Sequence, residues 1–380
     1  MKHKIIILLF SITFFTHQTV LSQQNINGGF TYNGNYRTYI LHIPGTYSGS
    51  VPVPLVFNLH GYSSNATQQQ FYSAMDVVSD TAGFLVVYPN AVNSVWDTLF
   101  TSSAIDDVGF LSALIDTIRQ DYLIDTLRIF SCGISMGGYM TYRLACELHD
   151  RIAAVASVAG PTVNPIFDSC QNTPPMPVLH FHGTADSTVP YNGQGMWPPV
   201  DTIIQYFVSK NGCPLFPDTT PIPDIWAPDN CTVTRFDYSP CDDSSEVVFF
   251  KIFNGGHTWP GGTVDIIPFG NTNRDINASV EIWNFFRKHK LQDTFVSVDE
   301  NIINRFVTLF PNPAQKEVMI SSERPILKIS VYSSAAVPYH ETRTSGINEI
   351  ILEVSDLPSG FYIVKIDYDK GSEYRKFIRM

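Results

Sequence analysis

Positive charge is scarce in this chain of 380 residues, which has 24 Lys and Arg against 35 Asp and Glu and a formal net charge of −11. A protein that binds nucleic acid is expected to carry a cluster of basic residues, and the sequence contains none. The acidic excess lies in residues 23–295, with 12 basic and 24 acidic residues, whereas residues 296–380 hold 10 and 11. We therefore exclude nucleic-acid partners and disfavour polyanionic substrates.

Long apolar runs are also missing after the first 22 residues, so we expect no membrane span in the mature protein. The N-terminal segment itself has Lys2 and Lys4, then an apolar run over residues 5–15 and a small residue, Ser22. This pattern predicts a cleavable secretion signal over residues 1–22. A membrane anchor is the alternative, but the run is short for a bilayer of ~30 Å.

Cysteine is sparse, with six residues, none in a CxxC pair and none in a Cys/His cluster with zinc spacing. We therefore predict no metal site. Export makes disulfides possible, and the pairs we prefer are Cys146 with Cys170 and Cys213 with Cys241. Other connectivities stay open at this point. Cys132 lies in an apolar run, and we expect it to be a buried free thiol.

Short apolar runs alternate with helical patterns through most of the chain. This alternation predicts an α/β domain over residues 23–295 with a mostly parallel sheet, preceded by a hairpin at residues 30–44. The expected strands are 53–59, 83–88, 128–132, 153–159, 178–182, 232–238 and 247–253, and the expected helices are 106–122, 136–148, 202–209 and 278–289. Residues 212–230 hold five prolines, and we expect an irregular insertion there that covers a site.

The pattern changes after Phe295. Residues 307–380 show short runs with two-residue alternation, at 327–332, 349–354, 361–366 and 374–380. Turn residues separate these runs, which predicts a small all-β sandwich after a linker over residues 296–306. We find no residue cluster for chemistry in this part of the sequence.

A G-x-S-x-G motif occupies residues 133–137, between an expected strand and an expected helix. This context exposes a nucleophilic serine on a sharp turn, so we predict Ser135 as the nucleophile. A structural glycine-rich turn is the alternative. Because a serine hydroxyl is a poor nucleophile, it needs a base that a carboxylate orients.

Chain order indicates the other two members, since this type of site has serine, then carboxylate, then histidine, each after a strand. Asp186 follows the expected strand 178–182, and His257 follows the expected strand 247–253. We therefore predict a triad of Ser135, Asp186 and His257.

Other residues compete for these roles. Asp106 and Asp107 are rival carboxylates, but their position indicates the cap of a helix. His180 and His182 share one face of a strand and could form a metal pair, but no third ligand is spaced nearby.

The oxyanion of an acyl transfer needs two preorganised N–H donors. We expect one from Met136, which follows the nucleophile, and one from Tyr62, in the loop after strand 53–59. Aromatic residues in loops near the expected site are candidates for the substrate pocket. With His60, these candidates are Trp197, Trp226 and Trp259.

Five motifs together resemble one family: LHGY (59–62), DDVGF (106–110), GISMGG (133–138), HGTADSTVPY (182–191) and GGHTWPG (255–261). They are similar to the polyhydroxybutyrate depolymerase and feruloyl esterase group, which overlaps carbohydrate esterase family 1. The resemblance spans about residues 28–292. It implies an α/β-hydrolase fold, hydrolysis of carboxylic esters by the predicted triad, and no cofactor. Tyr62 departs from the pattern, because a cysteine is common at that place.

The C-terminal part resembles another family through LFPNPA (309–314), DLPSGFYIVKI (356–366) and KFIRM (376–380). These segments are similar to the C-terminal sorting domain of the type IX secretion system. This resemblance implies a secreted protein whose residues 307–380 bind the secretion machinery.

The sequence thus favours a secreted serine esterase of the feruloyl esterase or polyhydroxybutyrate depolymerase type. Its ester substrate would be linked to a plant polysaccharide or part of a polyester. An esterase of acetylxylan or of another polyester is the nearest alternative. A non-catalytic surface-binding protein on the same scaffold and a peptidase are also open.

Overall fold

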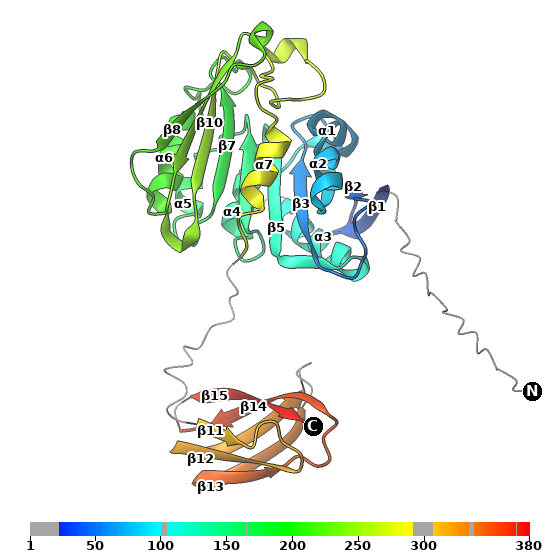
Figure 1. Cartoon of the computed structure of the whole chain (residues 1–380), viewed down its shortest axis with the longest axis vertical. Coiled ribbons are helices and arrows are strands. Elements are labelled where there is room, and N and C mark those ends of the chain that lie inside the picture. The colour runs from blue at the N-terminus through cyan, green and yellow to red at the C-terminus, as the bar shows by residue number, and fades with distance from the viewer. Residues whose placement is uncertain (1–22, 100–104, 165, 292–306, 334–337, 370) are drawn as a thin grey trace, which may run out of the picture. The chain divides into compact units, whose positions relative to one another are not determined.

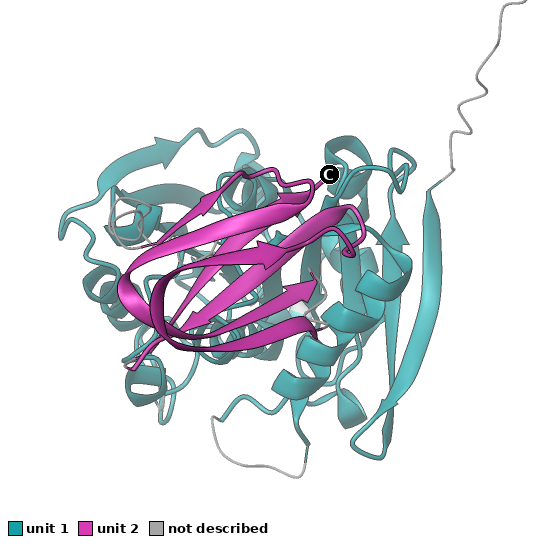
Figure 2. Cartoon of the chain, turned by 90° about the horizontal axis from the view of Figure 1, so that it is seen from below, with its two compact units in different colours: residues 1–292 teal, residues 293–380 magenta. Residues whose placement is uncertain are grey.

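The structure is a computed structural model that describes residues 23–99, 105–164, 166–291, 307–333, 338–369 and 371–380. The chain divides into two compact units, residues 1–292 and 293–380, which Figure 2 colours separately. Each unit has a hydrophobic core of its own. The predicted signal (1–22) and linker (296–306) lie outside the described residues.

The large unit is built on a ten-stranded mixed sheet with helices on both faces (Figure 1). Its six central strands pair in parallel, and the outer strands pair antiparallel. In sheet order the strands are β1 (Gln24–Tyr32), β2 (Asn35–Ile43), β4 (Leu85–Pro89), β3 (Val53–Leu59), β5 (Ile124–Ile134), β6 (Ala154–Val158), β7 (Val178–Gly183), β10 (Val247–Phe253), β9 (Thr232–Tyr238) and β8 (Asp218–Ile222). The predicted α/β-hydrolase fold is confirmed.

Helices cover both faces because side chains of the central strands alternate between them. Leu55 and Phe57 of β3 belong to a core shared with α3, α4 and α6, whereas Val56 belongs to a second core with α1, α2 and α7. The helices are α1 (Ala66–Ser73), α2 (Met75–Ala82), α3 (Asp107–Asp121), α4 (Met136–Glu147), α5 (Ile166–Ser169), α6 (Val200–Lys210) and α7 (Ala278–Phe286). Short 3₁₀ helices are η1 (Val92–Ser94), η2 (Ala227–Asp229), η3 (Asp242–Ser244) and η4 (Ile267–Phe269).

Two parts of the large unit differ from the expectation. Helices α1 and α2 were not predicted, because α1 has the polar sequence ATQQQFYS, whose apolar residues do not mark a helix. The side chain of Asn65 caps α1 by accepting from the N–H of Gln68. The insertion at 212–230 is not wholly irregular, because it contains β8, which pairs with β9 at the edge of the sheet.

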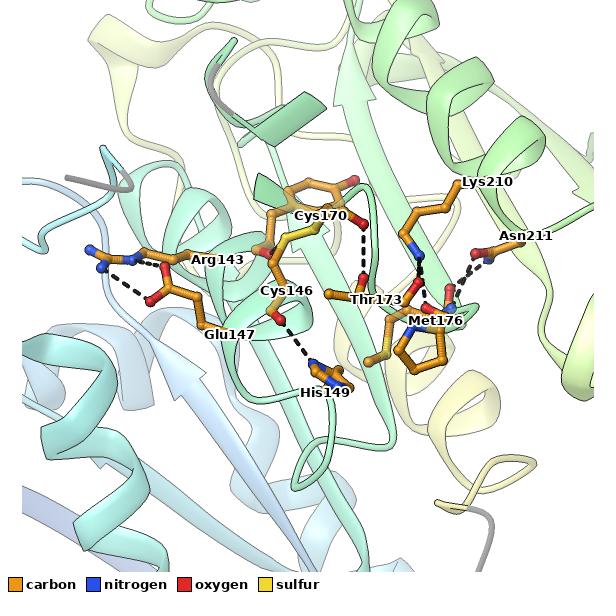
Figure 3. Close-up of a disulfide and its surroundings, with 11 residues drawn as sticks. Arg143, Cys146, Glu147, His149, Cys170, Thr173, Met176, Lys210 and Asn211 are labelled. Carbon is orange, nitrogen blue, oxygen red and sulfur yellow. Dashed lines mark hydrogen bonds and ion pairs between the residues drawn. A yellow bond between two sulfur atoms is a disulfide. The ribbon is translucent and has the colours of Figure 1, made fainter. Parts of the chain in front are cut away.

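Both predicted disulfides are present. Cys146 of α4 bonds to Cys170 just after α5, and Cys213 bonds to Cys241. Figure 3 shows the first bridge beside the Arg143–Glu147 ion pair of α4. The bridge therefore ties the helix that follows Ser135 to the segment after β6.

The small unit is a five-stranded antiparallel sheet, which confirms an all-β C-terminal part. The long strand β12 pairs with β13 along its length, with β11 at its start and with β14 at its end. Buried residues from both halves, such as Val318 and Val331, share one core. The strands are β11 (Val307–Phe310), β12 (Glu317–Ser333), β13 (Pro338–Glu353), β14 (Gly360–Asp367) and β15 (Ser372–Arg379).

Candidate active site

Ser135 lies at the sharp turn between β5 and α4. Its backbone angles are φ 54° and ψ −119°, a positive φ that is strained for any residue other than glycine. A Cβ atom on Gly137 would lie 2.2 Å from the carbonyl oxygen of Leu59, so glycine is needed for α4 to begin this close to β3. The Ser135 N–H donates to the carbonyl of Val158 at 2.9 Å. This turn has the strand–turn–helix geometry of a nucleophile elbow, with a half-buried serine.

Asp186 and His257 form a buried carboxylate–imidazole pair. His257 Nδ1 lies 2.7 Å from Asp186 Oδ2, although the residues are 71 positions apart. Because a carboxylate oxygen only accepts, the neutral ring carries its proton on Nδ1 and keeps a lone pair on Nε2. The other carboxylate oxygen accepts from the N–H groups of Thr188 (2.9 Å) and Val189 (2.8 Å). The imidazole is thus held in the tautomer that a general base requires.

The parallel strands bring these residues to one edge of the sheet. Strands β3, β5, β7 and β10 run in the same direction, so the loops after them share the carboxyl edge. Ser135, Asp186 and His257 lie in the segments that follow β5, β7 and β10. A Cβ atom on Gly61 would lie 3.4 Å from the Cβ of Ser135, so the loop after β3 lies directly beside the serine.

His60 does not line a pocket, contrary to the expectation, because its side chain is fully buried. Its Nδ1 donates to the carbonyl of Gly61 at 2.8 Å, and its Nε2 accepts from the N–H of Ala91 at 3.1 Å. The ring lies 5.1 Å from the ring of Trp96, whose Nε1 donates to the His60 carbonyl. Burial lowers the pKa of His60, which favours the neutral ring. His60 therefore holds the loop that carries Tyr62.

The three candidate tryptophans occupy different environments. Trp259 is fully buried, and its Nε1 donates to Ser279 Oγ at 3.2 Å, so it cannot form a pocket wall as expected. Trp226 is half exposed in the loop between β8 and β9. Since β9 begins opposite the end of β10, this loop lies at the edge that carries His257. Trp197 is half-buried after β7, at a bridge with Gln194.

The competing residues have structural roles. Asp106 caps α3 by accepting from the N–H of Gly109, and Asp107 forms a buried ion pair with Arg37 at 2.6 Å. His180 Nε2 and His182 Nδ1 lie 3.3 Å apart and contact each other. The spacing of these two histidines in the sequence suggests only a metal pair and does not indicate that they lie next to Asp186.

Among the residues that the structure describes, no group of three or more His, Cys, Asp or Glu is placed to hold a metal ion. In the same residues, no helix has both the length and the apolar character that a membrane span requires.

Residues 308–380 match the family model described as a secretion system C-terminal sorting domain. The large unit is similar to curated esterases. Feruloyl esterase C of Emericella nidulans is 31% identical over 233 residues, which covers 59% of this chain and 77% of that enzyme. The bifunctional acetylxylan esterase/xylanase of Neocallimastix patriciarum is 31% identical over 208 residues, which covers 54% of this chain but only 29% of that longer protein. Among solved structures, an acetyl xylan esterase from Aspergillus awamori has a TM-score of 0.46 and 18% identity, over 62% of this chain and 94% of that one.

Proposed function

The chain belongs to the family of carboxylic-ester hydrolases that includes feruloyl esterase C, and from this membership we propose that it releases aromatic acids from plant polysaccharides through Ser135, His257 and Asp186. It is an esterase, and its C-terminal sorting domain makes it a secreted one. The observation that carries the proposed mechanism is the Asp186–His257 bond at the sheet edge where Ser135 directly follows β5.

In the proposed reaction, Ser135 Oγ attacks the ester carbonyl while His257 Nε2 takes its proton. The N–H groups of Met136 and Tyr62 stabilise the oxyanion, and the alcohol leaves with a proton from His257. Water, activated by the same imidazole, then hydrolyses the acyl-enzyme and releases the acid. Asp186 orients the ring and stabilises its charged form.

The substrate class is argued from the relatives and from the exposed surface. Curated relatives bear the names feruloyl esterase and acetylxylan esterase. At the catalytic edge, the side chains of Tyr62, Met196 and Trp226 are exposed, and such groups can pack against an aromatic acyl ring. This favours a feruloyl ester over an acetyl ester, which offers no ring to pack against.

The first experiment labels the secreted protein with a fluorophosphonate, with Ser135→Ala as the control. Labelling of the wild type alone supports the nucleophile, and absence of labelling in folded wild type favours a non-catalytic binding protein. The second compares kcat/KM on methyl ferulate, acetylated xylan and polyhydroxybutyrate. A higher value on acetylated xylan or on the polyester would overturn the aromatic specificity, and cleavage of peptides alone would indicate a peptidase.

A further inference from the structure

A chain of buried side chains joins the helix after the nucleophile to the loop that carries Asp186. Tyr142 of α4 has its hydroxyl 3.0 Å from His180 Nδ1, and His180 Nε2 lies 3.3 Å from His182 Nδ1. His182 Nε2 lies 2.9 Å from the carbonyl oxygen of Val189 and 3.4 Å from Asp186 Oδ2. Tyr142 and the two histidines are at most 1% exposed, so bulk solvent does not reach this series of side chains.

The acceptor at one end fixes the direction of every bond. The carbonyl of Val189 only accepts, so Nε2 of His182 carries a proton. Burial lowers the pKa of both histidines, so each ring is neutral and has a single N–H. His182 Nδ1 must then accept from His180 Nε2–H, and His180 Nδ1 must accept from the hydroxyl of Tyr142. All the donors therefore point toward the Asp186 loop.

The last member of this chain holds Asp186 in two ways. Its Nε2–H is directed at Val189 O with Asp186 Oδ2 only 0.5 Å farther away, at 3.4 Å against 2.9 Å. Val189 is also the residue whose N–H donates to Asp186 Oδ1 at 2.8 Å. His182 thus fixes the position of Val189, which hydrogen-bonds to Asp186. Its N–H also points toward Asp186 Oδ2, the oxygen that accepts from His257.

We propose that His182 is a positioning residue of the active site. Tyr142, His180 and His182 form a hydrogen-bond relay in which every donor points toward the Asp186 loop, and this relay fixes the position of Asp186 relative to the helix that follows Ser135. This inference rests on the proposed triad. The relay positions Asp186, and Asp186 stabilises the imidazole of His257, which becomes charged only as the reaction proceeds. The relay therefore stabilises the transition state more than it strengthens substrate binding.

The test compares His182→Leu with His182→Gln on a soluble ester, because a glutamine amide N–H can reach the position of Nε2. We expect His182→Leu to lower kcat by about 10- to 100-fold with KM within about threefold, and His182→Gln to restore kcat to within about fivefold of wild type. Equal losses in both variants, or a loss only in KM, would overturn the relay.

A matched control is His42→Leu. His42 is also buried, lies on β2 away from the catalytic edge, and bonds to Asn25 of β1 and Asp80 of α2. The kcat of this variant should stay within about twofold of wild type.

If His182→Leu does not fold, Tyr142→Phe removes one oxygen from the far end of the relay and should lower kcat by about two- to fivefold. An unchanged kcat in folded Tyr142→Phe would count against the relay. If Ser135→Ala keeps its activity, the proposed function itself fails, whatever His182 does.

Discussion

The Nδ1–H of His60 donates to the carbonyl oxygen of Gly61 at 2.8 Å, and this bond orients the peptide that carries the Tyr62 N–H. A trans peptide is planar, so its C=O and N–H point in opposite directions. Because the imidazole holds the Gly61 oxygen, the Tyr62 N–H points away from His60. Gly61 itself lies beside Ser135, where the oxyanion would form.

This relationship gives the first prediction. We expect His60→Leu to lower kcat by about 10- to 100-fold with a small change in KM, because a misaligned oxyanion donor costs transition-state stabilisation. His60→Asn keeps a donor near the position of Nδ1 and should lose much less. Steady-state kinetics on a soluble ester measure both, and an unchanged kcat in folded His60→Leu would refute this positioning of Tyr62.

The nucleophile gives the second prediction. Ser135→Ala should lower ester turnover by about 10⁴- to 10⁶-fold while the protein stays folded, because no other hydroxyl replaces the attacking group. The measurement is initial-rate hydrolysis by purified protein, with circular dichroism to check the fold. More than a tenth of the wild-type rate would show that this triad assignment is wrong.

The buried histidines predict how stability depends on pH. Their pKa values are lowered in the folded state, with Tyr142 and His182 facing His180, and with Asp186 and His257 facing His182. Below about pH 6.5 the unfolded chain therefore binds protons that the folded chain does not, and the free energy of unfolding falls by up to about 1.4 kcal/mol per pH unit for each such histidine. The free energy of unfolding is therefore highest above that pH and decreases on acidification.

Urea unfolding followed by tryptophan fluorescence tests this dependence, because all five tryptophans lie in the large unit. In His180→Gln the slope of unfolding free energy against pH should be smaller by about 1 kcal/mol per unit between pH 6.5 and 5. The same slope in both proteins would show that His180 is protonated in the folded state.

The Cys213–Cys241 bridge gives the fourth prediction. It closes a loop with a sequence separation of 28, for which the chain-entropy relation gives about 3–4 kcal/mol. Replacing both cysteines by alanine should lower the free energy of unfolding of the large unit by that amount. Mass spectrometry of the secreted protein should count two free thiols, Cys132 and Cys231. Six free thiols would contradict both bridges.

The division into two units gives the fifth prediction. A chain that ends at Gln292 keeps every strand and helix of the large unit, so kcat and KM on a small ester should stay within about threefold of the full-length values. In the native host, loss of the sorting domain should leave the enzyme in the periplasm. Inactivity of the folded truncation, or its normal appearance outside the cell, would disprove the separation of roles.

Much of this protein is readable from the sequence because the information is local. Apolar runs and helical spacing indicate the central strands and α3, α4, α6 and α7. The G-x-S-x-G motif indicates a strand–turn–helix at Ser135, since only glycine fits the close approach of α4 to β3. Chain order, together with the position of each residue after a strand, then selects Asp186 and His257, which the fold joins at 2.7 Å.

The remaining features depend on contacts between distant segments, which periodicity does not encode. Trp259 lies in a loop after β10, but its backbone N–H donates to the hydroxyl of Tyr72, 187 positions earlier, and its Nε1 donates to Ser279. Its side chain is fully buried, so it belongs to the core. The spacing of His180 and His182 in the sequence places them on one face of a strand. Which of their ring nitrogens donates is decided by the carbonyl of Val189, which only accepts, and by burial against α4, which keeps both rings neutral. A hydrogen bond takes its direction from the acceptor that the fold supplies, and only the tertiary structure decides which acceptor that is.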